Sequence, residues 1–392
     1  MTGRHAMGGT RLTPLDLLTD LVAFDTETPK SNLALIAYVE AYLAGWGVPF
    51  VRLPNADGDK AALFATIGPA IDGGVVLSGH TDVVPVAGQT WTSDPYRLRV
   101  EDGRAYGRGA VDMKGFVALA LAHVPDFIAA DPAKPIHLFL SYDEETTCLG
   151  VVDGINRFGV DLPRPGAVIV GEPTDLTIAD AHKSVVTFTT TVKGKEAHSA
   201  KPALGASAVM AAGLLVAELV RLADVYAARG DASGRFDPPC STIHVGTIAG
   251  GTARNIMAKE CHFHWEFRGL PDLDGNEIPA RFSAYADEVL ARMRRTAPEA
   301  SIETICHADV PGLRPLPGSP AEELVKAVTG RNSTLTVSYA TEAGRFQNAG
   351  VPTVVCGPGS INRAHQPDEY ITLAELEAGA DFMRRLAAKL KG

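Results

Sequence analysis

The chain has 392 residues, of which 46% are hydrophobic and 21% charged, so it can bury a sizeable core and does not have the composition of a disordered protein. Its 36 Lys and Arg against 46 Asp and Glu leave a formal charge of −10, which argues against a nucleic-acid-binding surface. The apolar runs are shorter than the roughly 18 residues of a membrane span, and residues 1–10 lack the apolar stretch of a signal peptide. Five scattered cysteines without a CxxC pair argue against a disulfide framework. We therefore expect a globular, cytoplasmic protein with no nucleic-acid or membrane partner.

The first part of the chain alternates helical and strand patterns. Short apolar runs bounded by turn residues alternate with amphipathic segments, which is typical of an α/β domain with a mostly parallel central sheet. Helices are expected over 13–24, 33–45 and 115–128, and strands over 61–67, 75–78, 136–142 and 167–170.

The pattern changes near residue 184, where alternation and β-branched residues dominate. The order strand, helix, strand, strand, helix, strand predicts an inserted α+β domain of the ferredoxin-like type. Its expected elements are 185–192, 203–223, 241–248, 259–268, 278–296 and 301–307. The α/β pattern then returns, with a strand at 353–356 and a helix at 372–390. We therefore expect a catalytic domain formed by 1–183 and 308–392, interrupted by a domain at 184–307.

Acidic and imidazole side chains follow the ends of several expected strands. Ligands of open α/β sheets bind beyond the carboxyl ends of the strands, so these segments should meet at one edge. They are SGHTD (78–82), GRGAVDMKG (107–115), DEET (143–146), GEPT (171–174) and NRAHQPDE (362–369).

Such a set of carboxylates is costly to bring together unless cations neutralise it. Two His and three or more carboxylates, without Cys, suit one or two divalent ions such as zinc, cobalt or manganese. Each signal alone has a plainer explanation, because a single His after a strand is usually packed or solvated and a Glu-Glu pair is usually on the surface. The recurrence of these residues at strand ends favours the metal site.

At these residues the sequence resembles the M20 family of zinc metallopeptidases and amidohydrolases. The segments GHTDVVP (79–85), GRGAVDMKGF (107–116), DEET (143–146), GEPT (171–174) and AHS (197–199) match that family in order and spacing. Within it, the chain is most similar to the acetylornithine deacetylases, through AHKS (181–184) and the stretch 338–370.

The resemblance implies two divalent metal ions, zinc with cobalt as the alternative, and a residue set to hold them. Asp112 is implied as the carboxylate that bridges the two ions, and Asp82 as the group that orients the imidazole of one ligand. Glu144 is implied as the general base that takes a proton from the bridging water. The implied terminal ligands are His80 and Glu172 for one ion, and Glu145 and His365 for the other.

The resemblance also implies that the inserted domain acts as a lid and forms a homodimer. It assigns His198, offered by the partner subunit, to the substrate carbonyl, Asn255 to the oxyanion region and Arg268 to the substrate carboxylate. Glu342, in the TEA segment, is our candidate partner for a substrate ammonium group. Arg345 lies close by in sequence and does not suit a cationic substrate, so its role is left open.

The implied reaction is the hydrolysis of N2-acetyl-L-ornithine to L-ornithine and acetate, a step of arginine biosynthesis. Succinyl-diaminopimelate desuccinylase or a general N-acyl-L-amino acid amidohydrolase are the nearest alternatives. An aminopeptidase or dipeptidase with the same two-metal site is more distant. A binding protein that has lost catalysis is the last alternative, because every family position that we can check is filled.

Overall fold

The computed structural model describes residues 9–392, so most of the stretch on which the signal-peptide expectation rests lies outside the described residues. The chain folds into two compact units. The first contains the described residues up to 180 together with 315–335 and 341–392, and the second contains 181–314 and 336–340. The second unit thus extends beyond both ends of the insert expected at 184–307, and it includes residues 336–340, which the sequence pattern assigns to the first unit.

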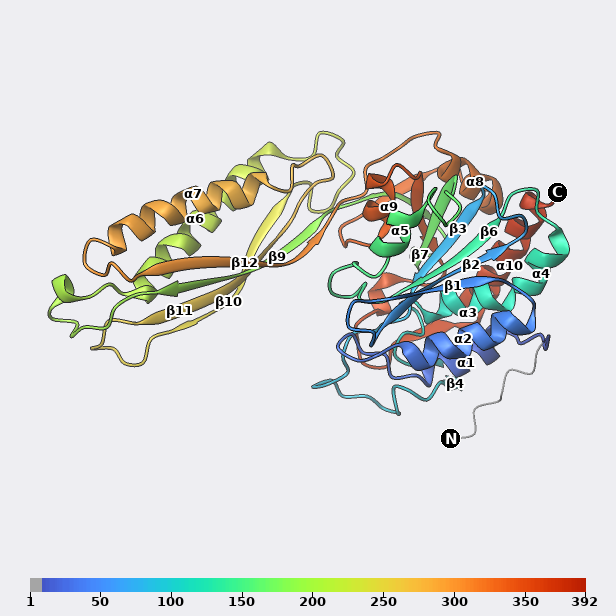
Figure 1. The fold of residues 1–392 in the computed structure, drawn as a ribbon, viewed down its shortest axis with the longest axis horizontal. Helices are drawn as coiled ribbons and strands as arrows, with labels where there is room; N and C mark the ends of the chain where they lie inside the picture. The colour runs from blue at the N-terminus through green and yellow to red at the C-terminus, as the bar shows by residue number, and fades with distance from the viewer. Residues whose placement is uncertain (1–8) are drawn as a thin grey trace. The chain divides into compact units, whose positions relative to one another are not determined.

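The first unit is built on an eight-stranded mixed sheet with a parallel centre (Figure 1). Strands β6 (Ile136–Ser141), β3 (Val75–His80), β7 (Ala167–Pro173) and β14 (Thr353–Gly357) lie side by side and run parallel. On one side β2 (Ala61–Ile67) and β1 (Phe50–Pro54) continue the sheet in antiparallel pairing, and on the other side β8 (Ile178–His182) and β13 (Thr334–Val337) follow. The carboxyl ends of the four central strands therefore share one edge.

Helices cover both faces of this sheet. One face packs on the main apolar core of the unit, which draws on α1–α4, α8 and α10, and the other carries a cluster of phenylalanine rings, such as Phe139 with its centroid 5.7 Å from that of Phe346. The helices are α1 (Pro14–Val22), α2 (Leu33–Gly45), α3 (Lys114–Ala122), α4 (Val124–Ala130), α5 (Val152–Arg157), α8 (Pro320–Thr329), α9 (Ala343–Asn348) and α10 (Leu373–Leu390). A small sheet joins β4 (Arg99–Glu101), β5 (Arg104–Tyr106) and β15 (Tyr370–Thr372), and a 3-10 turn, η2, covers Ile361–Arg363.

Local sequence explains where several helices begin and end. α1 begins with a capping box between Thr13 and Asp16 and with Pro14 in its first turn, where the missing N–H costs nothing. The single helix expected over 115–128 is divided at His123, because Pro125 cannot donate a helical hydrogen bond and disfavours helical geometry in the residue before it.

The second unit has the expected order of elements. It contains β9 (Val185–Lys193), α6 (Ala208–Arg229), β10 (Thr242–Gly250), β11 (Glu260–Arg268), α7 (Glu277–Met293) and β12 (Ser301–Val310), with a 3-10 turn, η1, at Pro202–Leu204. The strands form an antiparallel sheet in the order β10-β11-β9-β12. The two helices pack on the side of the sheet that holds this unit's own apolar core. Helix α6 starts later than the expected residue 203, because Ser207 caps it by accepting the N–H of Met210.

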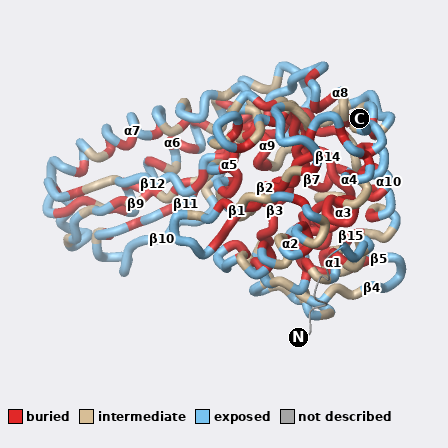
Figure 2. Tube along the Cα trace, turned by 45° about the vertical axis from the view of Figure 1, so that its right-hand side comes forward, coloured by how far each residue is buried: buried red, intermediate tan, exposed pale blue. Residues whose placement is uncertain are grey.

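The strands of the two units differ in how far their residues are buried. In Figure 2 the central strands of the first unit are almost wholly buried, as strands covered on both faces must be. The strands of the second unit alternate, as in β9, where every second residue is buried. Within residues 9–392, no helix combines the length and the apolar character that crossing a membrane requires.

Candidate active site

The segments singled out in the sequence meet at the carboxyl edge of the central parallel strands. His80 ends β3, Glu172 lies near the end of β7, and Glu145 follows β6. Asp112 precedes the first turn of α3, and His365 follows β14 and η2. Because these strands are neighbours and parallel, five residues spread over nearly 290 positions become a single cluster.

One group of possible metal ligands consists of His80, Asp112 and Glu172, all buried. The Nε2 atom of His80 lies 3.1 Å from Asp112 Oδ1 and 3.3 Å from Glu172 Oε1. A nitrogen and two carboxylate oxygens thus face a common point, which is the donor set of a catalytic zinc site with a position left for water or substrate.

The second group consists of Asp112, Glu145 and His365. Here the Nε2 atom of His365 lies 3.1 Å from Asp112 Oδ2 and 3.0 Å from Glu145 Oε2. Asp112 therefore offers one oxygen to each group. This is the geometry of a carboxylate shared between two cations.

Several observations fit two divalent cations at these groups. Buried polar atoms normally have a hydrogen-bond partner, yet the Oε1 atoms of Glu145 and Glu172 have none in the structure. Four carboxylates, including that of Glu144, approach one another with side chains less than a tenth exposed. Like charges so placed repel strongly unless a cation lies between them. The oxygen and imidazole donors are those that zinc, cobalt and manganese accept.

The pKa values of the cluster show this crowding. Burial and the neighbouring charge of Asp112 raise the pKa of Glu145 to about 7 and that of Glu172 to about 8. Burial and the charge of Glu172 also hold the pKa of Glu144 well above its usual value. Hydrogen bonds to Asp112 and Glu145 raise the pKa of His365 to about 11. The metal-free cluster thus retains protons that bound cations would replace.

The imidazole of His80 is oriented by a backbone group. Its Nδ1 atom lies 2.9 Å from the carbonyl oxygen of Asp82, and because a carbonyl only accepts, Nδ1 carries a proton and Nε2 is the ring nitrogen that faces Asp112 and Glu172. The Asp82 carboxylate lies 3.6 Å from the ring. It instead accepts the backbone N–H groups of Glu144 and Glu145, each at 3.2 Å. Asp82 therefore joins His80 to the loop that carries the expected base.

Glu144 lies beside both ligand groups without belonging to either. Its Oε2 atom is 3.9 Å from His80 Nε2. The thiol of Cys148, four residues later in the same loop, is 3.5 Å from Glu144 Oε1. A buried carboxylate that lies beside candidate metal ligands without being one of them is placed to accept a proton there.

Glu342 and Arg345 both lie close to this loop in the first unit. The carboxylate of Glu342 is buried, and its two oxygens accept hydrogen bonds from the hydroxyls of Ser78 and Ser141 at 2.5 and 2.7 Å. Its expected contact with a substrate ammonium group stays a prediction. Arg345 donates to the carbonyl oxygen of Thr147 at 2.6 Å, so at least part of its guanidinium holds the loop rather than a ligand.

The remaining expected site residues lie in the second unit. His198 is exposed, and its Nδ1 accepts the backbone N–H of Ala200 at 3.0 Å. Asn255 is also exposed, and the side chain of Arg268 is about a third exposed with its Nε donating to Glu266 at 3.1 Å. These residues are not part of either ligand group.

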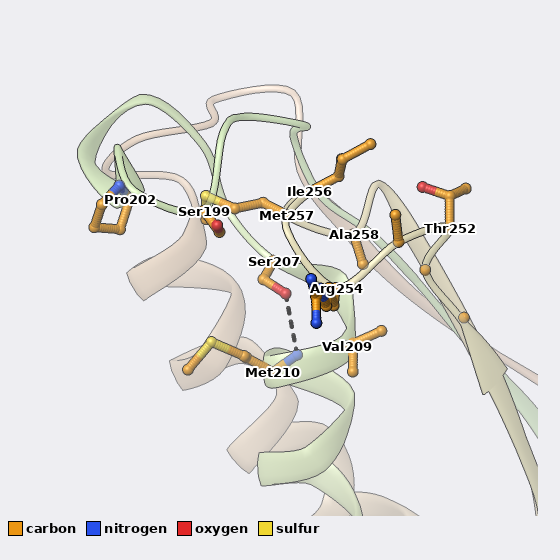
Figure 3. Close-up of a pocket in the computed structure, with 13 residues that line it drawn as sticks. Ser199, Pro202, Ser207, Val209, Met210, Thr252, Arg254, Ile256, Met257 and Ala258 are labelled. Carbon is orange, nitrogen blue, oxygen red and sulfur yellow. Dashed lines mark hydrogen bonds between the residues drawn. The ribbon is translucent and has the colours of Figure 1, made fainter.

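A cavity of about 540 Å³ opens in the second unit between the segments 199–210 and 250–258 (Figure 3). Met210, Arg254 and Ile256 are among the residues that line it, and Ile256 pairs through its backbone with His198. The expected residues His198 and Asn255 therefore lie beside a hollow large enough for part of a small molecule or a side chain.

Residues that sequence reasoning passed over also contact the cluster. Glu369 accepts the backbone N–H of Asp112, and Arg108 pairs with Glu369 at 2.7 Å. Both lie inside segments that sequence reasoning singled out, GRGAVDMKG and NRAHQPDE. Neither segment carries a local signal that distinguishes these two residues, because charged side chains are common in turns.

Comparison with known proteins agrees with this geometry. The model of peptidase family M20/M25/M40 matches residues 76–389. An acetylornithine deacetylase from Shigella sonnei (strain Ss046) is 35% identical over 346 residues, which cover 87% of this chain and 87% of that protein.

Solved structures share the fold. The aminopeptidase PepT from Bacillus cereus ATCC 10987 superposes with a TM-score of 0.75 at 18% identity, covering 98% of this chain and 99% of that one. The M20 family metallo-carboxypeptidase Sso-CP2 from Sulfolobus solfataricus also gives a TM-score of 0.75, at 17% identity over 96% and 99% of the two chains. The chain belongs to peptidase family M20/M25/M40.

Proposed function

From its membership of peptidase family M20/M25/M40, we propose that this enzyme removes the acetyl group from N2-acetyl-L-ornithine, giving L-ornithine and acetate as a step of arginine biosynthesis. The main observation in support of a metal-dependent hydrolytic activity is the pair of ligand groups that share Asp112, with Glu144 beside them. The choice of substrate is supported by the 35% identity to an acetylornithine deacetylase.

The ligand groups supply the conditions for hydrolysis. Two zinc or cobalt ions would be held by five residues, namely His80, Glu172, Asp112, Glu145 and His365. When bound, such ions polarise a carbonyl and lower the pKa of a water molecule towards neutrality. Glu144 then accepts the proton of the attacking water and passes it to the leaving amine, because its carboxylate faces the cluster and its pKa is raised by burial.

We propose that the second unit serves as a lid that completes the site. His198 and Asn255 would donate to the oxygen that becomes negative in the transition state. Arg268 would hold the α-carboxylate, for which a planar guanidinium is well suited. These assignments rest on the family resemblance and on the exposed or partly exposed side chains, which are available to a ligand.

We further propose that the second unit forms a homodimer. Its sheet ends in β10, an edge strand on which Ile248 is half exposed, and α6 packs beside β10. The outer surface of α6 exposes Met210, Leu214 and Val220. An edge strand next to an apolar helix face is typical of a protein–protein interface. A cytoplasmic location is also proposed, since all five cysteines are free thiols.

A panel of substrates on metal-reconstituted enzyme tests the proposed reaction. N2-acetyl-L-ornithine should give the highest kcat/KM, ahead of N-succinyl-L,L-diaminopimelate and of N-acetyl derivatives of neutral amino acids. Preference for the succinyl compound or for neutral amino acids would point to the two nearest alternatives. Hydrolysis of free-amine dipeptides, with N-acetyl compounds left intact, would instead identify a peptidase.

A further inference from the structure

Glu369 is a buried carboxylate directly behind the shared ligand. Its Oε1 atom accepts the backbone N–H groups of Val111 and Asp112, at 2.9 and 3.1 Å. Its Oε2 atom accepts a hydrogen bond from Nη1 of Arg108 at 2.7 Å, and both side chains of this ion pair are 1% exposed. A buried carboxylate that accepts two backbone N–H groups and pairs with a buried guanidinium holds the peptide that bears Asp112 in one position.

Arg108 links Glu369 to a second segment of the chain, residues 89–91. Its Nη2 donates to the side-chain oxygen of Gln89 at 2.5 Å, and its guanidinium lies 5.0 Å from the ring centroid of Trp91. The indole N–H of Trp91 also donates to the Gln89 oxygen, at 3.1 Å. Two donors on this one oxygen fix which end of the Gln89 amide is oxygen and which is nitrogen.

The nitrogen of Gln89 reaches a predicted metal ligand. Its Nε2 donates to the backbone carbonyl oxygen of His365 at 2.8 Å. The side chain of His365 is 52% exposed, so side-chain packing alone holds the imidazole weakly, and its φ of +63° is one that residues other than glycine seldom adopt. The backbone anchor therefore contributes much of what places this ring.

We propose that Gln89, Arg108 and Glu369 form a positioning network for the second metal site, the one bounded by Asp112, Glu145 and His365. This inference rests on the proposed metal-dependent function. The network connects the backbone N–H of Asp112, the shared ligand, to the backbone carbonyl of His365. The first group shares only Asp112 with this network, because its other two residues, His80 and Glu172, lie within strands of the central sheet. Gln89 contacts His365 directly and reaches Asp112 only through Arg108 and Glu369, so its loss should weaken the second site and leave the first nearly unchanged.

The test measures zinc affinity at each site separately. A Glu172→Ala background leaves only the second group complete, and a His365→Ala background leaves only the first. In the Glu172→Ala background, Gln89→Ala should weaken zinc binding by about 10- to 100-fold, as is usual when a partner of a ligand is lost. In the His365→Ala background it should leave the affinity nearly unchanged. Competition with a chromophoric chelator, together with the visible spectrum of the cobalt form, gives both values without an activity assay.

Two further variants keep the result interpretable. Gln89→Glu retains an acceptor for Arg108 but cannot donate to His365, so it should produce the same selective loss even if the alanine variant folds poorly. Gln366→Ala is the matched control, because its amide donates only to the carbonyl oxygen of Asn362, and it should leave both affinities unchanged. Equal effects in the two backgrounds, or no effect, would overturn the network. A wild-type protein that binds no zinc would instead overturn the proposed function.

Discussion

The carbonyl oxygen of Asp82 lies 2.9 Å from Nδ1 of His80, closer than the Asp82 carboxylate, which holds the loop of the expected base. We expect Asp82→Asn to leave zinc affinity at the His80 group within a few-fold of wild type, because the backbone contact remains. Turnover should fall by about 10- to 100-fold. One backbone N–H of the loop would then face the NH2 group of the asparagine, which is a donor and cannot accept it. Zinc titration and steady-state kinetics on the same preparation separate these effects.

Glu144→Gln should lower kcat by roughly 10²- to 10⁴-fold, because an amide cannot accept the proton that a general base removes. Metal content should stay at two ions per chain, since Glu144 belongs to neither ligand group. Atomic emission after dialysis and initial-rate kinetics measure the two quantities. Near-normal turnover in this variant would mean that another group is the base.

Removal of metal should abolish activity, and zinc or cobalt should restore it. Asp112→Ala should lose both ions, because Asp112 offers an oxygen to each group. Glu172→Ala and His365→Ala should each retain about one ion, as a single group stays complete in each. Metal content per chain, measured by atomic emission, distinguishes these cases. Activity that survives prolonged chelation would argue against the metal mechanism.

Glu342→Gln tests the expected contact with the substrate ammonium. If that carboxylate meets the charge, KM should rise for N2-acetyl-L-ornithine and change little for N-acetyl-L-norvaline, which lacks the amine. Equal losses for both substrates would assign Glu342 to the buried contacts with Ser78 and Ser141 alone. Ser141→Ala is a matched control that removes one hydroxyl donor and keeps the carboxylate.

Acid should destabilise the fold partly through His137, whose pKa burial lowers from 6.5 to about 4. Between these values the unfolded chain binds a proton that the folded chain does not, so the free energy of unfolding falls as pH drops through 6.5 and levels off below 4. The loss is about 3 kcal/mol for a shift of this size. Urea unfolding at several pH values should show a shallower decline for His137→Gln. The same substitution at exposed His262 should leave the decline unchanged.

The clustering of the expected ligand residues could be predicted from the sequence because of how parallel sheets are built. His80, Glu145 and Glu172 each lie at or just after the end of a short apolar strand, so their chain positions alone imply a common edge. The strand and helix order of the inserted unit was also readable, because alternation along β9 and the periodicity of α6 and α7 reflect burial on one side.

The contacts that support these ligands were decided only by the tertiary structure. Nothing in the local sequence shows that Glu369 reaches the backbone of Asp112, or that Gln89 reaches His365 across 276 positions. The same holds for Asp82, whose carbonyl rather than carboxylate meets His80. Strand-end position follows from local periodicity, whereas these partners depend on side-chain rotamers and on which distant loops pack together, and those are settled only when the whole core is assembled.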